Sequence, residues 1–376
     1  MIPLFSRGKY KTLNTVYVSR SAILHNHNAL QRLHPKAYIC PVLKSNAYGC
    51  GLQTVAPIFD SLHAPFLIVD SLYEAYELSK IHAKTPVLIL GYTSPANLKH
   101  KKLPFHFTVY EETLLEGLIR FQPHIPIHLF VDTGMCREGI PLSNLRTFIR
   151  RAKTKGANIV GLASHFADAD NSTSDIYWKR QLTKMKEALM IMRSESIEPT
   201  WKHLSASAGT FKLHDPEFNM IRAGLISYGI SPLGEQDSPD VFACKPIARF
   251  CSTLVQVKTI TKGSLVGYNG TYQVKQATKI GIISAGYYEG VDRRLSNIGF
   301  VKVCGMFCPI IGRVSMNMTT IDLSLVPNVR VGDEIEIYSD DPLTKNSFVN
   351  VAKLSKTIPY ELLVHIAESV RRTIVE

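Results

Sequence analysis

The feature that most constrains the fold of this chain is a regular alternation of strand-like and helix-like segments between about residues 20 and 235. Short apolar runs alternate with longer helical patterns, the clearest of which covers residues 174–192, and this is typical of a parallel sheet. The predicted strands are residues 37–44, 64–69, 86–91, 105–110, 126–132, 158–165, 200–205 and 218–222. Eight such steps in about 210 residues predict an α/β fold, a (β/α)8 TIM-type barrel.

The pattern changes beyond residue 235. Residues 235–242, EQDSPDVF, form a polar join that contains proline, and the segments after it are strand-like and separated by glycine-bearing turns. We therefore predict two domains, a barrel over residues 1–235 and a C-terminal β-rich domain over residues 236–376. About the first 15 residues are expected to pack with the C-terminal domain, which closes with a helical pattern near residues 360–372.

The charge balance, 43 Lys and Arg against 31 Asp and Glu, gives a net charge of +12 and allows contact with nucleic acid or an acidic surface. The basic residues are scattered, however, and cluster only briefly, at residues 100–102 and 150–155. The sequence contains no aromatic RNA-binding strand, zinc-finger spacing or basic-region heptad repeat. A solvated basic surface without a nucleic-acid partner is the favoured interpretation.

Cysteine usage and hydropathy indicate where the chain works. Its 7 cysteines show no disulfide-framework spacing, which favours a reducing cytoplasm. No run of about 18 apolar residues occurs, and the apolar patch within residues 1–13 is too short for a signal peptide, so no membrane association is expected. Cys304 and Cys308 form a C-x3-C pair without a nearby histidine, so no metal site is expected.

Polar side chains follow several of the predicted strands. Lys44 follows CPVL, His165 follows GLAS and Arg222 follows FNMI, while Arg137 lies in the loop after HLFVD. Since the carboxyl ends of barrel strands meet at one face, where active sites form, these groups are expected to gather there. Taken alone, Lys44 is also compatible with a surface lysine that merely ends a strand.

Two further segments favour phosphate binding at the same face. Ser207, in SASAG, precedes a predicted helix start, and Gly224 and Leu225 follow Arg222 directly. Backbone N–H groups at such starts can hold a phosphate. A lysine beside a phosphate cradle suggests a Schiff base with pyridoxal 5'-phosphate (PLP).

The segment VLKSNAYGCG, residues 42–51, resembles the lysine motif of alanine racemases, the fold-type III PLP enzymes. Further segments resemble the motifs of this family in the same order: VDTGMCREG (131–139), SHFADAD (164–170), HLSASAG (203–209), MIRAGLISYG (220–229), VGYNGTY (266–272), AGYYEGVDR (285–293), GRVSMNM (312–318) and TIPYE (357–361). The resemblance spans essentially the whole chain. It implies a homodimeric, PLP-dependent amino-acid racemase.

The resemblance also implies the cofactor contacts. Lys44 would carry the Schiff base, His165 would pack beside the pyridine ring, and Arg222 would face the ring nitrogen. Because arginine only donates hydrogen bonds, it would leave this nitrogen unprotonated, which favours a racemase over related decarboxylases that place an acid there. The residues implied for the phosphate are Tyr48, Ser207, Gly224, Leu225 and Tyr360.

On the substrate side, the resemblance implies two bases at the substrate Cα, Lys44 and Tyr268, the latter entering from the other subunit of a dimer with shared active sites. Moving a proton from one face of Cα to the other needs a base on each face. A tyrosine pKa of about 10 means that the site must lower it or relay the proton. Arg137 would reach the cofactor phenolate and the substrate carboxylate, which the Met316 backbone amide also binds. The residues implied at the substrate entrance are Tyr287, Arg293 and Arg313.

Two positions depart from the family pattern. Many relatives carry a carbamylated lysine where this chain has Phe130, and an aspartate where it has Asn317. Both changes remove negative charge near Arg137, so another partner, such as chloride, is expected to position it. The implied function is interconversion of L-alanine and D-alanine by a two-base mechanism, supplying D-alanine for peptidoglycan.

Other functions remain open at this stage. A racemase of broader specificity, acting on serine or other small amino acids, shares the motifs, and some such enzymes lack the carbamate. A PLP-binding homeostasis protein shares the lysine barrel but lacks the β-rich domain that carries Tyr268. A nucleic-acid-binding protein would explain the charge and none of the motifs.

Overall fold

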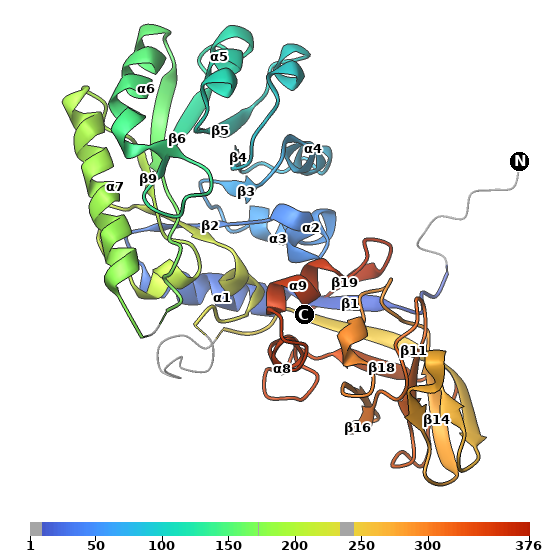
Figure 1. The fold of residues 1–376 in the computed structure, drawn as a ribbon. Coiled ribbons are helices and arrows are strands. Elements are labelled where there is room, and N and C mark those ends of the chain that lie inside the picture. Colours follow the sequence, from blue (N-terminus) through green and yellow to red (C-terminus); the bar gives the residue numbers. More distant parts are fainter. Residues whose placement is uncertain (1–9, 172, 234–243) are drawn as a thin grey trace, which may run out of the picture. The chain divides into compact units, whose positions relative to one another are not determined.

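A computed structural model describes residues 10–171, 173–233 and 244–376 of the chain (Figure 1). These residues form two compact units. The N-terminal unit consists of Ser21–Ala47 and the described part of Val55–Lys245, and the C-terminal unit of Tyr48–Thr54, Pro246–Glu376 and the described part of Met1–Arg20. The predicted join at residues 235–242, with its domain boundary, lies outside the described residues.

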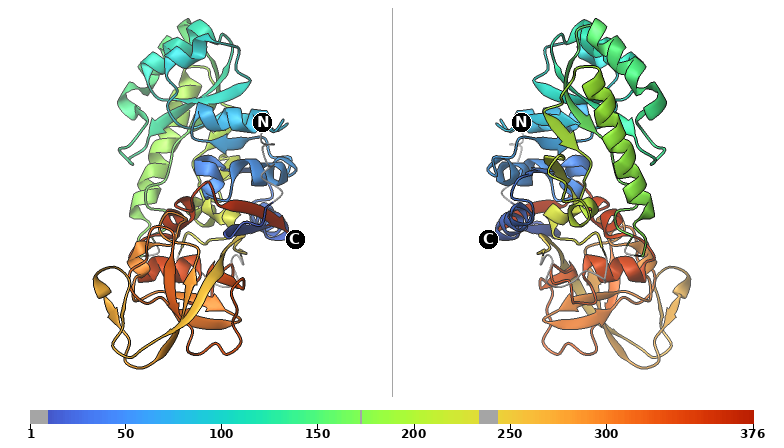
Figure 2. Two further views of the ribbon diagram at one scale, coloured as in Figure 1. Left: turned by 90° about the vertical axis from the view of Figure 1, so that its right-hand side faces the viewer. Right: turned by 90° about the vertical axis from the view of Figure 1, so that its left-hand side faces the viewer.

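The N-terminal unit is built on a curled parallel sheet (Figures 1 and 2). Every predicted strand segment overlaps an observed strand: β2 (Tyr38–Pro41), β3 (Leu67–Val69), β4 (Val87–Ile89), β5 (Phe105–Val109), β6 (Pro126–Asp132), β8 (Asn158–Ala163), β9 (Trp201–His203) and β10 (Met220–Ala223). The sheet order is β3-β4-β5-β6-β8-β9, with the short β7 (Ile140–Pro141) on β6, and β2 pairs in parallel with β10. Strands β3 and β4 are buried throughout, as in sheets covered on both faces.

Helices connect the strands, and α4 to α7 lie on the outer side of the sheet in Figure 1. The helices of this part of the chain are α1 (Arg20–Leu33), α3 (Leu52–Asp60), α4 (Leu72–Lys80), η1 (Pro95–Lys99), α5 (Glu112–Phe121), α6 (Leu142–Thr154), α7 (Ile176–Ser194), η2 (Ala208–Phe211) and η3 (Leu225–Tyr228). Ser71 and Glu74 form a capping box that fixes the start of α4. Helix α7 buries Trp178, Met185, Leu189 and Met192, the apolar face expected from their spacing.

The C-terminal unit contains a largely antiparallel sheet in the order β16-β15-β18-β11-β1-β19, with β14 between β11 and β17. Its strands are β1 (Thr15–Ser19), β11 (Ala248–Ile260), β14 (Thr278–Ile283), β15 (Phe300–Val303), β16 (Met306–Pro309), β17 (Thr319–Asp322), β18 (Glu334–Tyr338) and β19 (Arg371–Val375). Strand β1 lies between β11 and β19, so the N-terminal strand belongs to this sheet. The remaining elements are β12 (Leu265–Val266), η5 (Tyr268–Gly270), β13 (Tyr272–Gln273), η6 (Arg293–Leu295), α8 (Phe348–Leu354) and α9 (Pro359–Val364).

The helical pattern predicted near residues 360–372 is wrong at its C-terminal end. Helix α9 ends at Val364, and Arg371–Val375 form strand β19 instead. This strand pairs in parallel with β1, whose residues are more than 350 positions away in the sequence. Thr373, Ile374 and Val375 are β-branched and favour a strand once a partner is present. The pairing partner, rather than the local pattern, decides the structure here.

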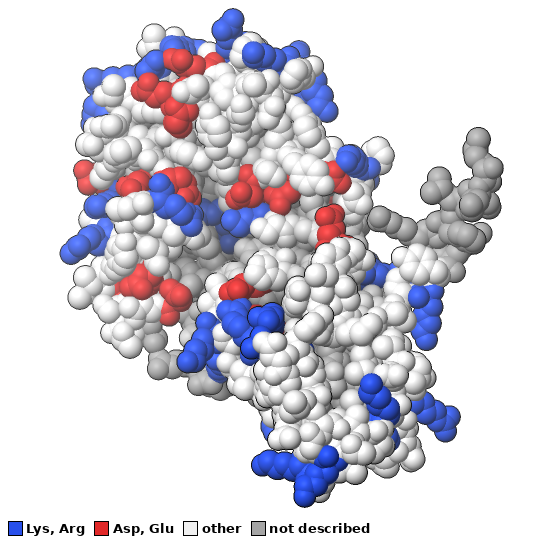
Figure 3. All heavy atoms as spheres, turned by 45° about the vertical axis from the view of Figure 1, so that its right-hand side comes forward, with Lys and Arg blue, Asp and Glu red and all other residues white. Residues whose placement is uncertain are grey.

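The molecular surface carries both signs of charge. On the face drawn in Figure 3, Lys and Arg side chains lie in several separate groups among Asp and Glu side chains. Over the described ranges, no helix combines the length and the apolar character that crossing a bilayer requires.

Candidate active site

Lys44 lies just beyond the end of strand β2. The Leu43 N–H donates to the Ile68 carbonyl at 2.7 Å, and Lys44 begins α2 (Lys44–Tyr48), a turn in which residues 45–48 all have positive φ, between 50° and 56°. Such left-handed backbone is unfavourable for residues with a Cβ, so neighbouring groups must hold it. The lysine therefore stands on a backbone turn with a fixed and unusual shape.

Glu74 holds this turn. Its Oε1 accepts a hydrogen bond from the Ser45 N–H at 2.6 Å, while its Oε2 accepts from the backbone N–H groups of Asp70 (2.8 Å) and Ser71 (3.2 Å). The Lys44 Nζ lies 3.4 Å from Asp70 Oδ1. The same acidic residues thus tie the lysine turn to the start of α4 and place a carboxylate beside the lysine amine.

Arg222, on β10, is 3% exposed and is held by neutral partners. Its NH1 donates to His203 Nδ1 (2.8 Å) and to the His203 carbonyl, and its NH2 donates to the Ser164 carbonyl (2.6 Å) and to His165 Nδ1 (3.0 Å). Burial lowers the pKa of Arg222 to about 10, so it stays charged at neutral pH. Within the described part of the chain, Nε is the one nitrogen of this guanidinium with no recorded hydrogen bond, so this donor remains for a ligand.

A chain of three histidines, the buried His203 and His128 and the half-buried His106, extends from Arg222 into the sheet. His203 Nε2 lies 2.9 Å from His128 Nδ1, and His128 Nε2 lies 3.2 Å from His106 Nδ1. Burial lowers the pKa of His106 to about 4 and those of His128 and His203 well below the ordinary range, so all three are neutral. Because Arg222 can only donate, each ring in turn accepts on Nδ1 and donates from Nε2. Arg222 therefore fixes the tautomers of the whole chain.

His165 joins the same network from the end of β8. Burial, together with the nearby charges of Arg222 and Arg137, lowers its pKa to about 3. Its Nδ1 accepts from Arg222, so a neutral His165 carries its proton on Nε2. The predicted neighbours His165 and Arg222 are thus in direct contact.

The loop that carries Arg137 has a shape set by Asp132 and two glycines. Asp132 Oδ1 accepts hydrogen bonds from the backbone N–H groups of Gly134 (2.8 Å) and Cys136 (3.1 Å). Gly139 has a φ of +132°, and a Cβ there would lie 2.5 Å from the Asp132 nitrogen, so the chain needs glycine at this position. The Arg137 side chain then pairs with the adjacent Glu138, which the sequence reading missed.

The segments predicted to bind phosphate lie together in the N-terminal unit. Ser207 is buried and directly precedes η2, and its Oγ accepts a hydrogen bond from the Ile226 N–H of η3 at 3.3 Å. Gly224 directly precedes η3, which begins at Leu225. The starts of two short helices therefore adjoin each other, with a serine hydroxyl between them.

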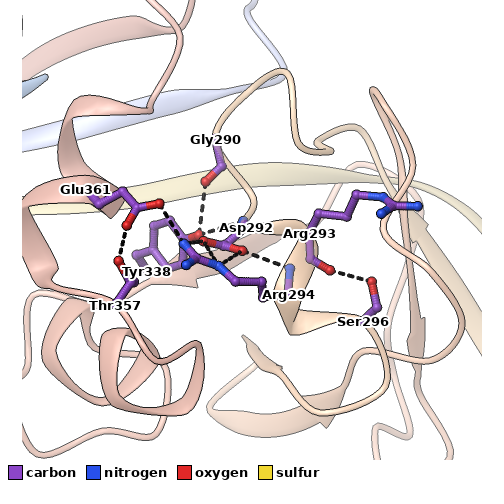
Figure 4. Close-up of polar contacts among 8 residues, drawn as sticks. All are labelled: Gly290, Asp292, Arg293, Arg294, Ser296, Tyr338, Thr357 and Glu361. Carbon is purple, nitrogen blue, oxygen red and sulfur yellow. Dashed lines mark hydrogen bonds and ion pairs between the residues drawn. The ribbon is translucent and has the colours of Figure 1, made fainter.

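The predicted residues of the C-terminal unit form two groups, and the first is Tyr48 with Tyr360. Their ring centroids lie 6.1 Å apart. Figure 4 shows how the neighbouring Glu361 is anchored: Arg294 donates to Glu361 Oε1 at 2.8 Å and to both oxygens of Asp292. Arg293, predicted at the substrate entrance, points its side chain away from this cluster in Figure 4, and its carbonyl accepts from the Ser296 hydroxyl.

The second group is largely exposed. Tyr268 is 69% exposed on η5, and Met316 and Tyr287 are also exposed. A Cβ on Gly267 would lie 3.1 Å from the Arg313 nitrogen, so the Tyr268 turn passes close to Arg313. The Tyr287 N–H donates to the Ser315 carbonyl at 3.0 Å, which places Tyr287 beside the Met316 segment. Asn317 donates to the buried Glu289 at 2.7 Å.

Phe130 lies on β6 and is 7% exposed, with its ring packed edge-on against Tyr110. Neither Phe130 nor Asn317 carries a charge. Three acidic residues of this region, Glu138, Asp70 and Glu74, were missed by the sequence reading. An acidic residue directly after Arg137, in CREG, was the available signal for Glu138.

A parallel α/β sheet with a lysine just beyond one strand end, a buried arginine on β10 and two adjoining helix starts, in a chain that also has a β-rich unit, fits the class of two-domain enzymes that bind a cofactor through a lysine. Comparison with known families then identifies the particular group. The alanine racemase N-terminal domain family matches residues 18–232, and the alanine racemase C-terminal domain family matches residues 247–374. The chain belongs to the alanine racemase family, which confirms the resemblance seen in the sequence.

Individual relatives agree with this assignment. The chain is similar to an alanine racemase of Syntrophobacter fumaroxidans, with 32% identity over 94% of this chain and 95% of the relative. It is 30% identical to a serine/alanine racemase of Enterococcus gallinarum over 94% of this chain and 50% of that protein. The fold is similar to that of a Bartonella henselae alanine racemase with covalently bound pyridoxal phosphate, at a TM-score of 0.84 and 23% identity, covering 97% of this chain and all of that one.

Proposed function

We propose that the protein interconverts L-alanine and D-alanine with PLP bound through Lys44. The observation that carries this proposal is the network around Arg222, in a chain whose two parts both match alanine racemase domains. The hydrogen-bond partners of the Arg222 guanidinium are neutral, and Nε–H is left as a donor. A donor on a guanidinium that no carboxylate hydrogen-bonds fits a pyridine nitrogen that only accepts.

The donors beyond the strand ends fit the rest of the cofactor. Ser207 and the backbone N–H groups of Gly224 and Leu225 would hold the phosphate, with the hydroxyls of Tyr48 and Tyr360. His165 would cover the ring, and Lys44 would provide the covalent attachment. When bound, PLP draws electron density away from the substrate Cα and makes its proton removable.

The residues of this chain then move that proton. The Lys44 amine, which lies 3.4 Å from the Asp70 carboxylate, would exchange a proton with Cα on one face. The Tyr268 hydroxyl would serve the opposite face. Arg137 and the Met316 N–H would bind the substrate carboxylate, which keeps Cα between the two bases. Tyr287, Arg293 and Arg313 would line the substrate entrance.

We also propose that the N-terminal sheet closes into a complete eight-stranded barrel. The proposed domains are residues 1–235 for the barrel and residues 236–376 for the β-rich domain, and the first ~15 residues pack with the second domain. Two contacts support closure. Val42, next to β2, forms a bridge to Ile68 of β3, and the N–H of Arg222 on β10 donates to the carbonyl of Ser205, just after β9, at 3.1 Å. These contacts would join the β2–β10 pair to both ends of the six-stranded order.

A homodimer with shared active sites is the proposed assembly. Tyr268, Met316 and Tyr287 combine exposure with apolar or aromatic character, which is typical of a surface that a partner covers. A two-fold dimer repeats the same contact twice, so each Tyr268 would complete the site of the other subunit. We place the enzyme in the cytoplasm, supplying D-alanine for peptidoglycan, without a nucleic-acid or membrane partner.

Serine is the second candidate substrate, because the Enterococcus gallinarum relative is a serine/alanine racemase. The test is a panel of L-amino acids assayed for their D-products. We expect D-alanine to form fastest and D-serine more slowly. Borohydride reduction followed by peptide mapping should place the pyridoxyl group on Lys44, and a label on a different lysine would contradict the assignment.

Subunit mixing tests the shared site. Lys44→Ala and Tyr268→Phe should each nearly abolish racemisation as homodimers. After subunit exchange, random pairing gives about half heterodimers with one intact site each, so activity should return to about a quarter of wild type. Exchange without any recovery would show that both bases belong to one chain.

A further inference from the structure

Among the residues that the structure describes, the Arg137 guanidinium makes its hydrogen bonds along one edge. The two hydrogen bonds recorded for its side chain both go to Glu138, from Nε to Oε2 and from NH2 to Oε1, the latter at 2.6 Å. This is the forked arrangement that arginine and carboxylate prefer, and it fixes the plane of the guanidinium as well as its position. The side chains are 57% and 28% exposed, so Arg137 stays accessible while Glu138 is the more enclosed partner.

The opposite edge of the same guanidinium is available. NH1 and the second N–H of NH2 point away from Nε, and together they form another pair of parallel donors. A carboxylate can bind this edge with the same forked geometry. Arg137 thus has the form of an adaptor between a carboxylate of the protein and a carboxylate of a ligand.

We propose that Glu138 is a positioning residue for racemisation: its carboxylate orients Arg137 so that the free edge meets the carboxylate of the amino-acid substrate. This inference rests on the proposed function, in which Arg137 binds that carboxylate. Glu138 acts through Arg137 and does not itself touch the substrate.

The surroundings leave this task to Glu138. Phe130 is apolar and packs against Tyr110. Asp70 is the other carboxylate that raises the pKa of Arg137, but its recorded side-chain contact is with Lys44. The preceding loop is fixed by Asp132 and by the glycine at 139, so Arg137 and Glu138 are presented from a defined backbone.

Glu138 is also charged under working conditions. Its pKa is lowered, chiefly by the hydrogen bond from Arg137 and also by the charge of Arg137, so it remains a carboxylate at neutral pH. Burial lowers the pKa values of Arg222 and His165, and the Glu138 charge partly opposes this, which places Glu138 within electrostatic reach of the groups around the proposed cofactor ring. Loss of this carboxylate would therefore change the electrostatics around Arg222 and His165 as well as the orientation of Arg137.

Two substitutions test the proposal in different ways. Glu138→Ala removes the carboxylate and leaves its space empty, whereas Glu138→Gln keeps the space filled and loses the charge. In both, Arg137 regains rotational freedom that alanine must restrict on binding, so we expect KM for alanine to rise by about tenfold, with a smaller change in kcat. Melting temperatures of the PLP-loaded proteins check that both variants are folded.

Acetate distinguishes positioning from a structural role. In wild type it should only compete with alanine for the free edge of Arg137 and raise KM. In Glu138→Ala, low concentrations of acetate should fill the empty position and lower KM toward the wild-type value. In Glu138→Gln the amide blocks that position, so acetate should inhibit as in wild type. Acetate that inhibits all three proteins equally would overturn the proposal, as would an unchanged KM in both variants.

A control variant and a non-reacting ligand complete the experiment. Glu116→Gln breaks the surface pair of Glu116 with Arg151 and should leave KM unchanged. Calorimetric binding of propionate, which cannot be racemised, should weaken by about tenfold in Glu138→Gln. If wild type racemises no alanine, the proposed function fails, and propionate binding still decides the role of Glu138. Equal propionate affinity in wild type and Glu138→Gln contradicts that role.

Discussion

Arg222 and Arg137 are two arginines of the same N-terminal unit held in opposite ways. Arg222 is 3% exposed and donates to histidine nitrogens and backbone carbonyls, while the Arg137 side chain is 57% exposed and donates to a carboxylate. Burial lowers the pKa of Arg222 to about 10, whereas the Glu138 hydrogen bond raises that of Arg137. Both remain cations, but their charges are compensated differently.

The difference teaches what each position requires. A buried cation without a carboxylate partner is costly, and it persists only when every surrounding dipole is aligned toward it. Such a charge is fixed and directional, which suits a donor aimed at a ring nitrogen. An exposed cation that forms two parallel hydrogen bonds with a carboxylate has a smaller desolvation cost and can adjust its position, which suits the binding of an incoming substrate.

The largest expected effect separates the two arginines by chemistry. Arg222→Glu places a carboxylic acid opposite the proposed position of the ring nitrogen and leaves His203 and the Ser164 carbonyl without their hydrogen-bond donor. We expect racemisation to fall by about a hundredfold or more, and side conversion of PLP to pyridoxamine phosphate to increase. Product analysis during long turnover measures both. An unchanged reaction profile in a folded variant would show that Arg222 does not face the cofactor ring.

A smaller effect is expected at the exposed arginine. Arg137→Lys keeps the charge but loses the forked edges that face Glu138 and the substrate. KM for alanine should rise by about tenfold or more without pyridoxamine phosphate formation, since the ring nitrogen is untouched. Steady-state kinetics beside the same product analysis provide the comparison. If pyridoxamine phosphate accumulates in this variant as it does in Arg222→Glu, the proposed roles of Arg222 at the ring nitrogen and of Arg137 at the substrate carboxylate are contradicted.

Between about pH 7.5 and 5.5, the pH dependence of stability should come chiefly from histidines whose pKa values burial lowers, which are the four of the Arg222 network together with His27 and His34. His106, His128, His165 and His203 are neutral when folded because burial lowers their pKa values, whereas the unfolded chain protonates them near pH 6.5. The unfolded state therefore binds more protons as pH falls, and each histidine of the network should lower the free energy of unfolding by about 1.4 kcal/mol in total across this range.

Urea unfolding of wild type, His128→Gln and Glu138→Gln at these two pH values tests this difference. The slope should become shallower in His128→Gln, which removes one titrating group. It should be unaltered in Glu138→Gln, because the pKa of Glu138 is lowered further below its ordinary 4.5 and the carboxylate does not titrate in this range. A shallower slope in Glu138→Gln, or an unaltered one in His128→Gln, would contradict the assignment.

The smallest effect is expected for an arginine that forms only solvent-exposed ion pairs. Arg151 pairs with Glu112 and Glu116 on the surface, and solvent screens both contacts. Arg151→Lys should leave the unfolding midpoint and the kinetics unchanged within error. A measurable loss of activity would mean that breaking any arginine ion pair of this unit lowers activity, so the effects at Arg222 and Arg137 would not show that they lie in the active site.

The sequence predicted the elements that depend on short-range patterns. Apolar runs bounded by turn residues marked the strands of the N-terminal unit, because a buried parallel strand must be apolar on both faces. For the same reason Lys44 could be placed just beyond a strand end, whereas Arg222, also expected after its strand, lies within β10. The prediction failed at residues 371–375, where the partner strand β1 comes from the opposite end of the chain.

The sequence by itself therefore determined the strand–helix alternation, the family motifs and the residue types at the strand ends. Only the tertiary structure decided which groups meet: Glu74 with the left-handed turn after Lys44, three histidines in a line behind Arg222, and Glu138 along one edge of Arg137. The physical reason is that strand formation follows from local hydrophobic periodicity. Hydrogen-bond partners are chosen by side-chain direction and burial, which exist only once distant segments are packed together.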